Sequence, residues 1–209
     1  MRKIFLVCLS LIAVLGVLVF LYLFVGIPGT NELKTFNPFQ PAIVFDVCSG
    51  ETIQVIPFSD FPKSLGDALS VAEPIPSRYA QVARYSLCNS RRRAGRYALD
   101  SYRLSQKLRF RFSVNEIQTI YLNRVYLGND THGIESGSLL YAHKHAKDLN
   151  LSESALLVGM IRSPARYSPS KYPDAAKARR NQVLDLMLGQ NLISTQDAER
   201  AKAEPLPAN

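Results

Sequence analysis

Glu73 is the residue of this sequence whose type and position best suit proton-transfer chemistry. It closes a segment with helical apolar spacing and is followed at once by Pro74 and Pro76, which disfavour continuation of a helix. A carboxylate at a helix C-terminus is electrostatically unfavourable, so its placement there needs a reason, and a glutamate that projects into a cleft as a general base is one. The alternative is an ordinary surface glutamate at a helix end.

A group of arginines follows within a short distance. Arg84 is succeeded by Arg91, Arg92, Arg93 and Arg96, so that four of the six residues in the range 91–96 are arginine. Guanidinium groups bind phosphate and pyrophosphate oxygens in a bidentate fashion. The same composition is typical of a solvated turn, and the cluster alone does not specify a ligand.

The elements that must position these side chains are mainly helical. Two β-branched runs, 42–47 and 52–56, flank a Gly-containing turn and predict one small hairpin. Ser113 and Glu116 have the spacing of a capping box, and Ser152 with Glu153 predicts another helix start. Apolar periodicity predicts helices over 61–73, 97–112, 113–127, 133–144, 152–161, 174–188 and 194–202. The segment 81–87 has a mixed pattern and carries no helix prediction of its own.

The N-terminus has the composition of a membrane anchor. No charged residue occurs from Ile4 to Val25, a run longer than the roughly 20 residues that cross a bilayer and longer than the apolar core of a cleaved signal peptide. Arg2 and Lys3 precede the run and predict a cytoplasmic N-terminus. We therefore expect a single-pass anchor (1–27) in the inner, cytoplasmic membrane, a linker (28–41) and a periplasmic or extracellular domain (42–209).

The formal net charge of +8 favours anionic head groups or pyrophosphate-bearing lipids as partners, although a basic solvated surface explains it equally well. The predicted orientation excludes nucleic acid. Cys48 and Cys88 lie on the oxidising side and either pair or remain free. No metal-ligand spacing is present, and His132, His143 and His145 are too close together for a catalytic triad.

The second half of the chain resembles glycosyltransferase family 51, the peptidoglycan polymerase module of bifunctional penicillin-binding proteins and monofunctional transglycosylases. The family pattern S-K-D-E-I-L-x-x-Y-L-N-x-x-Y-x-G corresponds to the range 113–128. Its later patterns G-I-E, L-x-x-x-E-x-A-x-L-x-G and P-x-x-Y-S-P correspond to residues that begin at Gly133, Leu149 and Pro164. The resemblance implies a mainly α, lysozyme-like fold with one small N-terminal β-hairpin, behind a single transmembrane helix.

The first half resembles the family less closely. The resemblance places Glu73 on the family's catalytic glutamate and Gln81 and Arg84 at the end of its second motif, so that a segment between these two motifs is missing. The third motif is altered, because Ser101 stands where its glutamate is expected.

The resemblance implies that lipid II is polymerised into glycan strands. Glu73 would deprotonate the acceptor hydroxyl, and basic residues, often with a divalent cation, would stabilise the departing lipid pyrophosphate. The resemblance implies no other cofactor. The substrate-binding residues that we expect are Gln81, Arg84, Arg91, Arg92, Asn123, Tyr126, Glu135 and Lys144. Two alternatives are a non-catalytic member that binds lipid-linked glycan or partner cell-wall synthases, and a purely structural anchor.

Overall fold

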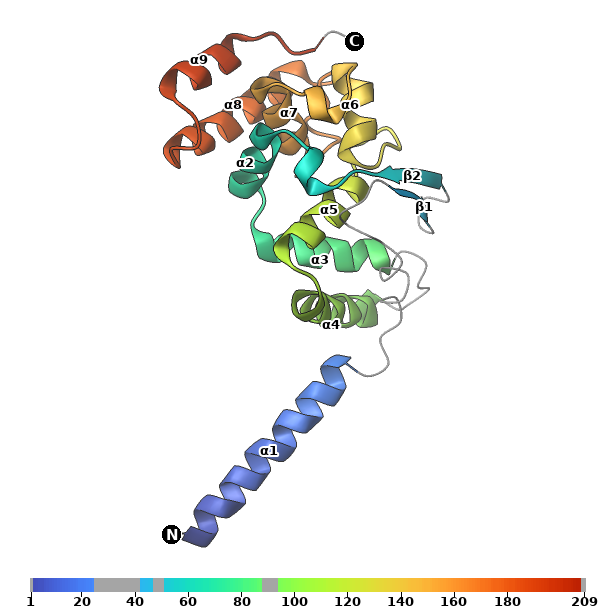
Figure 1. Ribbon diagram of the computed structural model, residues 1–209, viewed down its shortest axis with the longest axis vertical. Coiled ribbons are helices and arrows are strands. Elements are labelled where there is room, and N and C mark those ends of the chain that lie inside the picture. Colours follow the sequence, from blue (N-terminus) through green and yellow to red (C-terminus); the bar gives the residue numbers. More distant parts are fainter. Residues whose placement is uncertain (1, 25–41, 47–50, 88–93, 208–209) are drawn as a thin grey trace.

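The computed structural model describes residues 2–24, 42–46, 51–87 and 94–207, and it is built almost entirely of helices (Figure 1). The elements are α1 (Arg2–Phe24), β1 (Ala42–Asp46), β2 (Glu51–Val55), η2 (Phe58–Asp60), α2 (Lys63–Ala72), α3 (Ile75–Ser86), α4 (Ala94–Arg111), α5 (Val114–Arg124), α6 (Ile134–Ala142), η3 (Ala146–Asp148), α7 (Leu151–Ile161), α8 (Pro173–Gly189) and α9 (Thr195–Ala203). The prediction of a mainly α chain is confirmed.

The core is centred on α7. Its residues from Ser154 to Ile161 are all buried, as is Ser152, and it packs against α2 and α8. A helix that is apolar on every side has to be enclosed by its neighbours. A second group of contacts joins α3 to α4 and α5, below the first group in Figure 1.

The predicted hairpin is confirmed. Strands β1 and β2 pair antiparallel, with Ala42 opposite Val55 and Asp46 opposite Glu51. The chain that leaves β2 is bound to α5 through Asn123, whose amide accepts a hydrogen bond from Ile56 N at 2.9 Å and donates one to Ile56 O at 2.7 Å. Phe58 N adds a hydrogen bond to Thr119 Oγ1. These contacts fix the hairpin against the helical domain.

Helix α1 extends away from the domain at the N-terminal end of the chain (Figure 1). Its side chains are described for 8–21, where the large apolar ones are exposed. A search of the residues that the structure describes finds no helix with both the length and the apolar character needed to cross a membrane.

Helix α3 was not predicted. Pro74 and Pro76 do end α2, but α3 starts immediately after Pro74, with Pro76 in its first turn. Proline fits there because the amide hydrogens of the first turn have no partner within the helix. The mixed segment 81–87 is therefore the second half of a helix that prolines begin.

Three further boundaries differ from the prediction. Helix α5 ends at Arg124 instead of 127, because Val125 has an extended backbone with φ −61° and ψ 133°. The N-cap of α7 is Asn150, not Ser152, because Asn150 and Glu153 form the reciprocal capping box, while Ser152 is buried inside the helix. Helix α6 ends at Ala142, since His143 adopts a left-handed conformation with φ 56°. The capping box of Ser113 and Glu116 is confirmed.

Gly133 provides a test of how the fold joins α5 to α6. Its φ is +84°, and an added Cβ would lie 2.8 Å from the backbone oxygen of Asn123. We expect Gly133→Ala to lower the free energy of unfolding by roughly 2 kcal/mol or more, because it combines left-handed strain with a backbone clash. Urea denaturation followed by circular dichroism measures the change.

Gly189→Ala is the matched control. A Cβ at Gly189, the last residue of α8, meets nothing within 4 Å, so this variant should not lower stability and should raise it by at most about 1 kcal/mol. Equal stability of the two variants would contradict the close approach at Gly133.

Candidate functional site

A pocket of about 370 Å³ opens where α2, α3 and the end of α7 meet. Its lining residues are Glu73, Gln81, Arg84, Tyr85, Ile161 and Arg162. Three of the residues singled out in the sequence, Glu73, Gln81 and Arg84, are therefore brought to one place. The pocket combines a carboxylate, an amide and two guanidinium groups.

Glu73 lies in the junction between α2 and α3 rather than within a helix. It is the C-cap of α2, with an extended backbone at φ −131°, and only 8% of its surface is exposed. Its Oε2 accepts hydrogen bonds from Ser77 Oγ at 3.2 Å and from Gln81 Nε2 at 3.4 Å. In the described part of the chain its Oε1 accepts none, so this oxygen remains open to a ligand.

Arg78 holds the backbone of this junction. Its guanidinium donates from Nη2 to Leu69 O at 2.8 Å and from Nε and Nη2 to Glu73 O at 3.0 and 2.7 Å. Arg78 thus satisfies the carbonyl oxygen of Glu73 just after α2, whereas the carbonyl oxygen of Leu69 also accepts a hydrogen bond from Glu73 N at 3.1 Å. Burial lowers the pKa of Arg78, an effect that Tyr121 and Glu73 oppose. The position of Glu73 is consequently fixed from the backbone side as well as through its carboxylate.

Gln81 is itself held by a buried tyrosine. Tyr121 donates its hydroxyl hydrogen to Gln81 Oε1 at 3.3 Å, so the Gln81 amide links α5 to the carboxylate of Glu73. Burial raises the pKa of Tyr121 strongly, and the nearby Glu73 and Tyr85 add to the increase. Tyr121 therefore stays a neutral donor, which suits the acceptor that faces it.

Asn123 and Tyr126 do not line the pocket. The amide of Asn123 forms hydrogen bonds with the backbone of Ile56 and Thr119. It therefore stabilises the fold, whereas the sequence predicts a role in substrate binding. Tyr126 is exposed, and its ring centroid lies 5.0 Å from that of His132.

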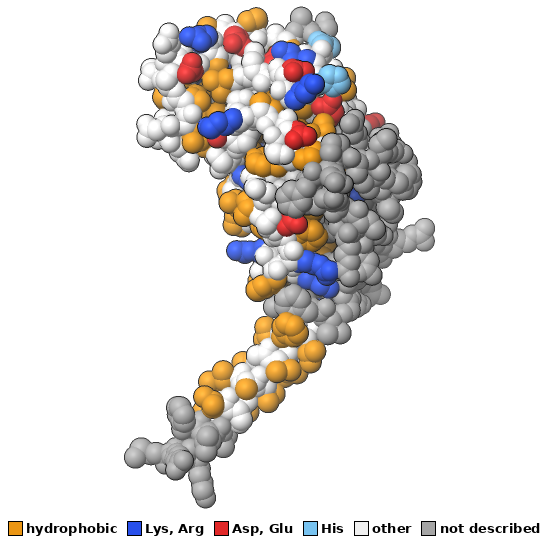
Figure 2. Space-filling view, viewed as in Figure 1, with side chains coloured by type: hydrophobic (Ala, Val, Ile, Leu, Met, Phe, Trp, Pro, Cys, Tyr) orange, Lys and Arg blue, Asp and Glu red, His pale blue; other side chains and the backbone are white. Residues whose placement is uncertain are grey.

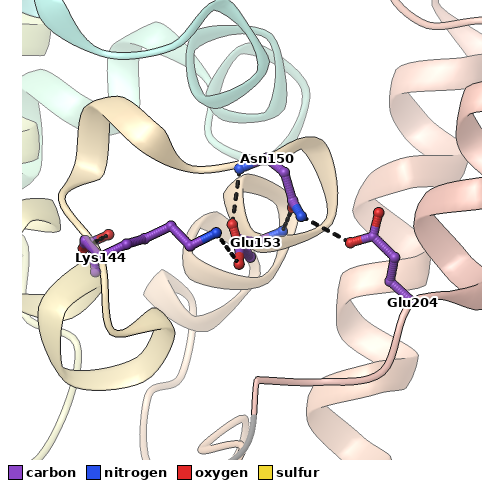
Figure 3. Close-up of polar contacts among 5 residues, drawn as sticks. Lys144, Asn150, Glu153 and Glu204 are labelled. Atoms are coloured by element: carbon purple, nitrogen blue, oxygen red, sulfur yellow. Dashed lines mark hydrogen bonds and ion pairs between the residues drawn. The ribbon is translucent and has the colours of Figure 1, made fainter.

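Glu135 and Lys144 also lie outside the pocket. Glu135 accepts hydrogen bonds from Ala146 N and contacts His145 Nδ1 at 2.6 Å. Lys144 Nζ pairs with Glu153 Oε1 at 2.8 Å (Figure 3), and Glu153 is also the partner of the N-cap Asn150 in the capping box of α7. Figure 3 shows the same network continuing through Asn150 to Glu204. Glu135 thus connects α6 to η3, and Lys144 connects the segment between them to α7.

Five residues singled out in the sequence lie outside the described residues. They are Arg91, Arg92, Arg93, Cys48 and Cys88.

Tyr85, Ile161 and Arg162 were missed by sequence reasoning. Tyr85 is one turn from Gln81 on α3, the helix that was not predicted, so knowledge of α3 would have indicated it. Ile161 and Arg162 belong to the end of α7, about 90 positions from Glu73 in the chain, and no local pattern connects them to it.

A divalent cation does not fit the described pocket. Such ions prefer several oxygen ligands, whereas the pocket offers one carboxylate beside two arginines. Among the described residues no group of three or more metal-ligating side chains is placed to hold an ion. No role in catalysis is therefore assigned to a metal ion in this pocket.

The sequence profile of the transglycosylase family matches residues 79–188. This range covers more than half of the chain. The chain belongs to the transglycosylase family. The matched range begins after Glu73, so the residue proposed as the base lies outside the part that identifies the family, whereas Gln81, Arg84 and Arg162 lie inside it.

Two penicillin-binding proteins 1A illustrate the relationship. The protein of Streptococcus oralis is 33% identical over 141 residues, which is 68% of this chain and 22% of the relative. That of Neisseria flavescens is 27% identical over 253 residues, which is 98% of this chain and 31% of the relative. This transglycosylase chain thus spans less than a third of either relative. The second alignment is longer than the 209 residues of the chain, so that relative contains additional residues within the aligned region.

The fold is similar to that of a solved member of the group. The crystal structure of penicillin-binding protein 1A from Haemophilus influenzae aligns with 81% of this chain and 21% of its own, at 24% identity and a TM-score of 0.50. This similarity supports the mainly helical transglycosylase fold.

Tyr121 makes the stability of the site depend on pH. Its pKa is higher in the folded than in the unfolded state, so its stabilising contribution is complete below about pH 10 and is lost as the pH rises further, by at most about 1.4 kcal/mol per pH unit. We expect Tyr121→Phe to be about 1 kcal/mol less stable than the wild type at pH 8. The difference should shrink or reverse at pH 11.

Urea unfolding at both pH values measures this difference. Tyr102→Phe, at an exposed tyrosine, is the control and should respond to pH as the wild type does. A gap between the wild type and Tyr121→Phe that stays constant up to pH 11 would contradict the assignment.

Proposed function

We propose that this protein is a peptidoglycan glycosyltransferase that polymerises lipid II into glycan strands. The observation that carries the proposal is the buried carboxylate of Glu73, held by Ser77 and Gln81 at the wall of a pocket that Arg84 also lines. Membership of the transglycosylase family gives the reaction class. The arrangement offers a positioned base and positive charge in one pocket, and glycosyl transfer from a lipid pyrophosphate needs both.

In the proposed reaction, Glu73 acts as general base on the acceptor sugar. Its open oxygen Oε1 takes the proton of the 4-hydroxyl group, and the hydroxyl oxygen forms a bond to the anomeric carbon of the donor. The bond from that carbon to the lipid pyrophosphate breaks, and the pyrophosphate leaves with the electron pair. Arg84 stabilises the negative charge that develops on it, and Arg91 and Arg92 extend this basic region in the proposal. Proton loss from Glu73 to water restores the base.

A binding protein without catalytic activity is the second candidate. It is favoured by the length of the Neisseria flavescens alignment, which exceeds that of this chain, and by the direct α2–α3 junction beside Glu73. If the residues that this chain lacks belong between the first two family motifs, part of the donor groove is missing. A displacement of about 1 Å at a reacting group already costs on the order of 10²-fold in rate. Such a protein would bind lipid-linked glycan or other cell-wall synthases.

Glu73→Gln distinguishes these candidates. It removes the base but keeps the shape and the hydrogen-bonding capacity of the side chain, so we expect polymerisation of labelled lipid II to fall by at least 10²-fold while binding of lipid II is retained. Glycan products are resolved by gel electrophoresis, and binding is measured separately with the full chain in detergent.

Glu199→Gln, on the exposed surface of α9, is the control and should polymerise as the wild type does. Saturable binding by a wild-type protein that forms no polymer would support the second candidate. Failure to bind and to polymerise would reject both in favour of a structural anchor.

We also propose that α1 tethers the domain to the inner membrane, with its N-terminus in the cytoplasm. Residues 1–27 form the anchor in this proposal, 28–41 the linker and 42–209 the domain outside the cytoplasm. The uncharged run from Ile4 to Val25 and the exposed apolar side chains of α1 support the tether, although none of the described helices has by itself the length and apolar character of a membrane-spanning helix. It would keep the pocket of Glu73 at the bilayer surface, where a lipid-linked substrate resides.

Charged substitutions in α1 test the tether. The pair Leu11→Arg and Leu15→Arg should release the protein from carbonate-washed membranes, because each arginine costs about 2.5–3.5 kcal/mol at the centre of a spanning helix. The control pair is Leu139→Arg and Leu140→Arg at exposed positions of α6, which should leave the protein in the membrane fraction. Complete extraction of the wild type by carbonate would refute the tether.

A further inference from the structure

Tyr85 is the aromatic side chain of the pocket, and it has no role in the chemistry proposed above. It lies on α3 beside Arg84 and one turn after Gln81, and it lines the pocket together with Glu73. Its side chain is half-buried, and the backbone of Tyr126 forms a hydrogen bond with its phenol group. The ring is therefore held both by α3 and by the segment that follows α5.

The environment of Tyr85 keeps this ring uncharged. Burial raises the pKa of its phenol group, the hydrogen bond with the backbone of Tyr126 opposes the rise, and the nearby carboxylate of Glu73 adds to it. A neutral aromatic ring beside the candidate base suits an uncharged part of a substrate, and it offers nothing to a pyrophosphate group.

The lining residues of the pocket differ in exposure and in polarity. Arg84 and Arg162 are exposed to solvent, whereas Glu73 is only 8% exposed. Tyr85 and Ile161 are the lining residues with large apolar surfaces, and they come from different helices, α3 and α7. The described pocket therefore combines cations near the solvent, a carboxylate at depth and an apolar surface contributed by two helices.

A pyranose ring matches this distribution of groups. Its hydroxyl groups lie around the edge of the ring, and its C–H groups give it faces of low polarity. A tyrosine offers a large, rigid apolar area for such a face, and small-molecule sites combine surfaces of this kind with a few placed polar groups. The volume of about 370 Å³ is near the lower end for such sites, so it suits a sugar unit better than a length of glycan strand.

We propose that Tyr85 stacks on the C–H face of the acceptor sugar and so determines that a pyranose occupies the pocket. In this position a hydroxyl group at the edge of the sugar reaches Glu73, and anionic groups of the substrate stay near Arg84 and Arg162. The contact exists before and during the reaction, so its loss raises KM and leaves kcat nearly unchanged.

This inference rests on the proposed function for the identity of the sugar, but it does not depend on turnover. A protein that binds lipid-linked glycan without polymerising it would use the same contact. Polymerisation and sugar binding are therefore measured separately, so that either can fail alone.

Two substitutions separate the ring of Tyr85 from its hydroxyl group. Tyr85→Leu removes the ring and keeps an apolar side chain, and we expect it to raise KM for lipid II by roughly 3- to 10-fold with kcat and the thermal unfolding midpoint close to the wild-type values. Tyr85→Phe keeps the ring and should leave KM near that of the wild type. Tyr172→Leu, at an exposed tyrosine outside the pocket, is the control and should leave KM unchanged.

Binding is followed without turnover through a reporter in the pocket. The sequence contains no tryptophan, so Tyr85→Trp introduces a single one. Because α1 exposes apolar side chains (Figure 2), the full chain is kept in detergent and titrated with N,N′-diacetylchitobiose, a soluble neutral sugar. We expect a saturable shift of the emission to shorter wavelength that inorganic pyrophosphate alone does not produce. The matched variant Tyr172→Trp should show no shift.

Two results would overturn the proposal. One is a KM for lipid II that is unchanged in Tyr85→Leu, or that rises equally in Tyr85→Phe, which would assign the effect to the hydroxyl group. The other is an emission of Tyr85→Trp that does not respond to the sugar, whether or not pyrophosphate changes it. A wild type that forms no polymer, together with a response of Tyr85→Trp to the sugar, would reject the proposed function and support the contact at Tyr85.

Discussion

The guanidinium group of Arg78 is the contact on which the candidate site depends. It is 1% exposed and binds the carbonyl oxygens of Leu69 and Glu73, where α2 ends and α3 begins. A buried carbonyl group without a partner would be costly, and Arg78 provides the partner of Glu73 O while it shares Leu69 O with the backbone amide of Glu73. The α2–α3 junction is therefore stabilised by this side chain, and Glu73 lies within the junction.

Side-chain hydrogen bonds connect the α2–α3 junction to other helices of the domain. Gln81, in the second half of α3, donates a hydrogen bond to the carboxylate of Glu73 and accepts one from Tyr121 of α5. The far wall of the pocket comes from Ile161 and Arg162 at the end of α7, the most enclosed helix of the domain. Glu73 is thus held by α3, which is linked to α5, and α7 lines the same pocket. Glu73 itself precedes the range that matches the family.

The same helical domain separates the residues that support the fold from those that line the pocket. Asn123, Glu135 and Lys144 satisfy backbone groups or opposite charges within the structure. Glu73, Arg84 and Arg162 face the pocket instead. The proposed chemistry depends on the second group, and the first group maintains the helices that hold it.

The sequence by itself determined the family, the helical class, the hairpin and the cap at Ser113, because each depends on local spacing or on short motifs. It also placed Glu73, Gln81 and Arg84 within one region of the chain. It did not identify α3, since the prolines that end one helix also fit the first turn of the next. Only the tertiary structure decided that Asn123 and Lys144 are engaged elsewhere and that Arg162 reaches the pocket. Those outcomes depend on contacts between residues far apart in the chain, such as Asn123 with Ile56, and local sequence patterns carry no information about them.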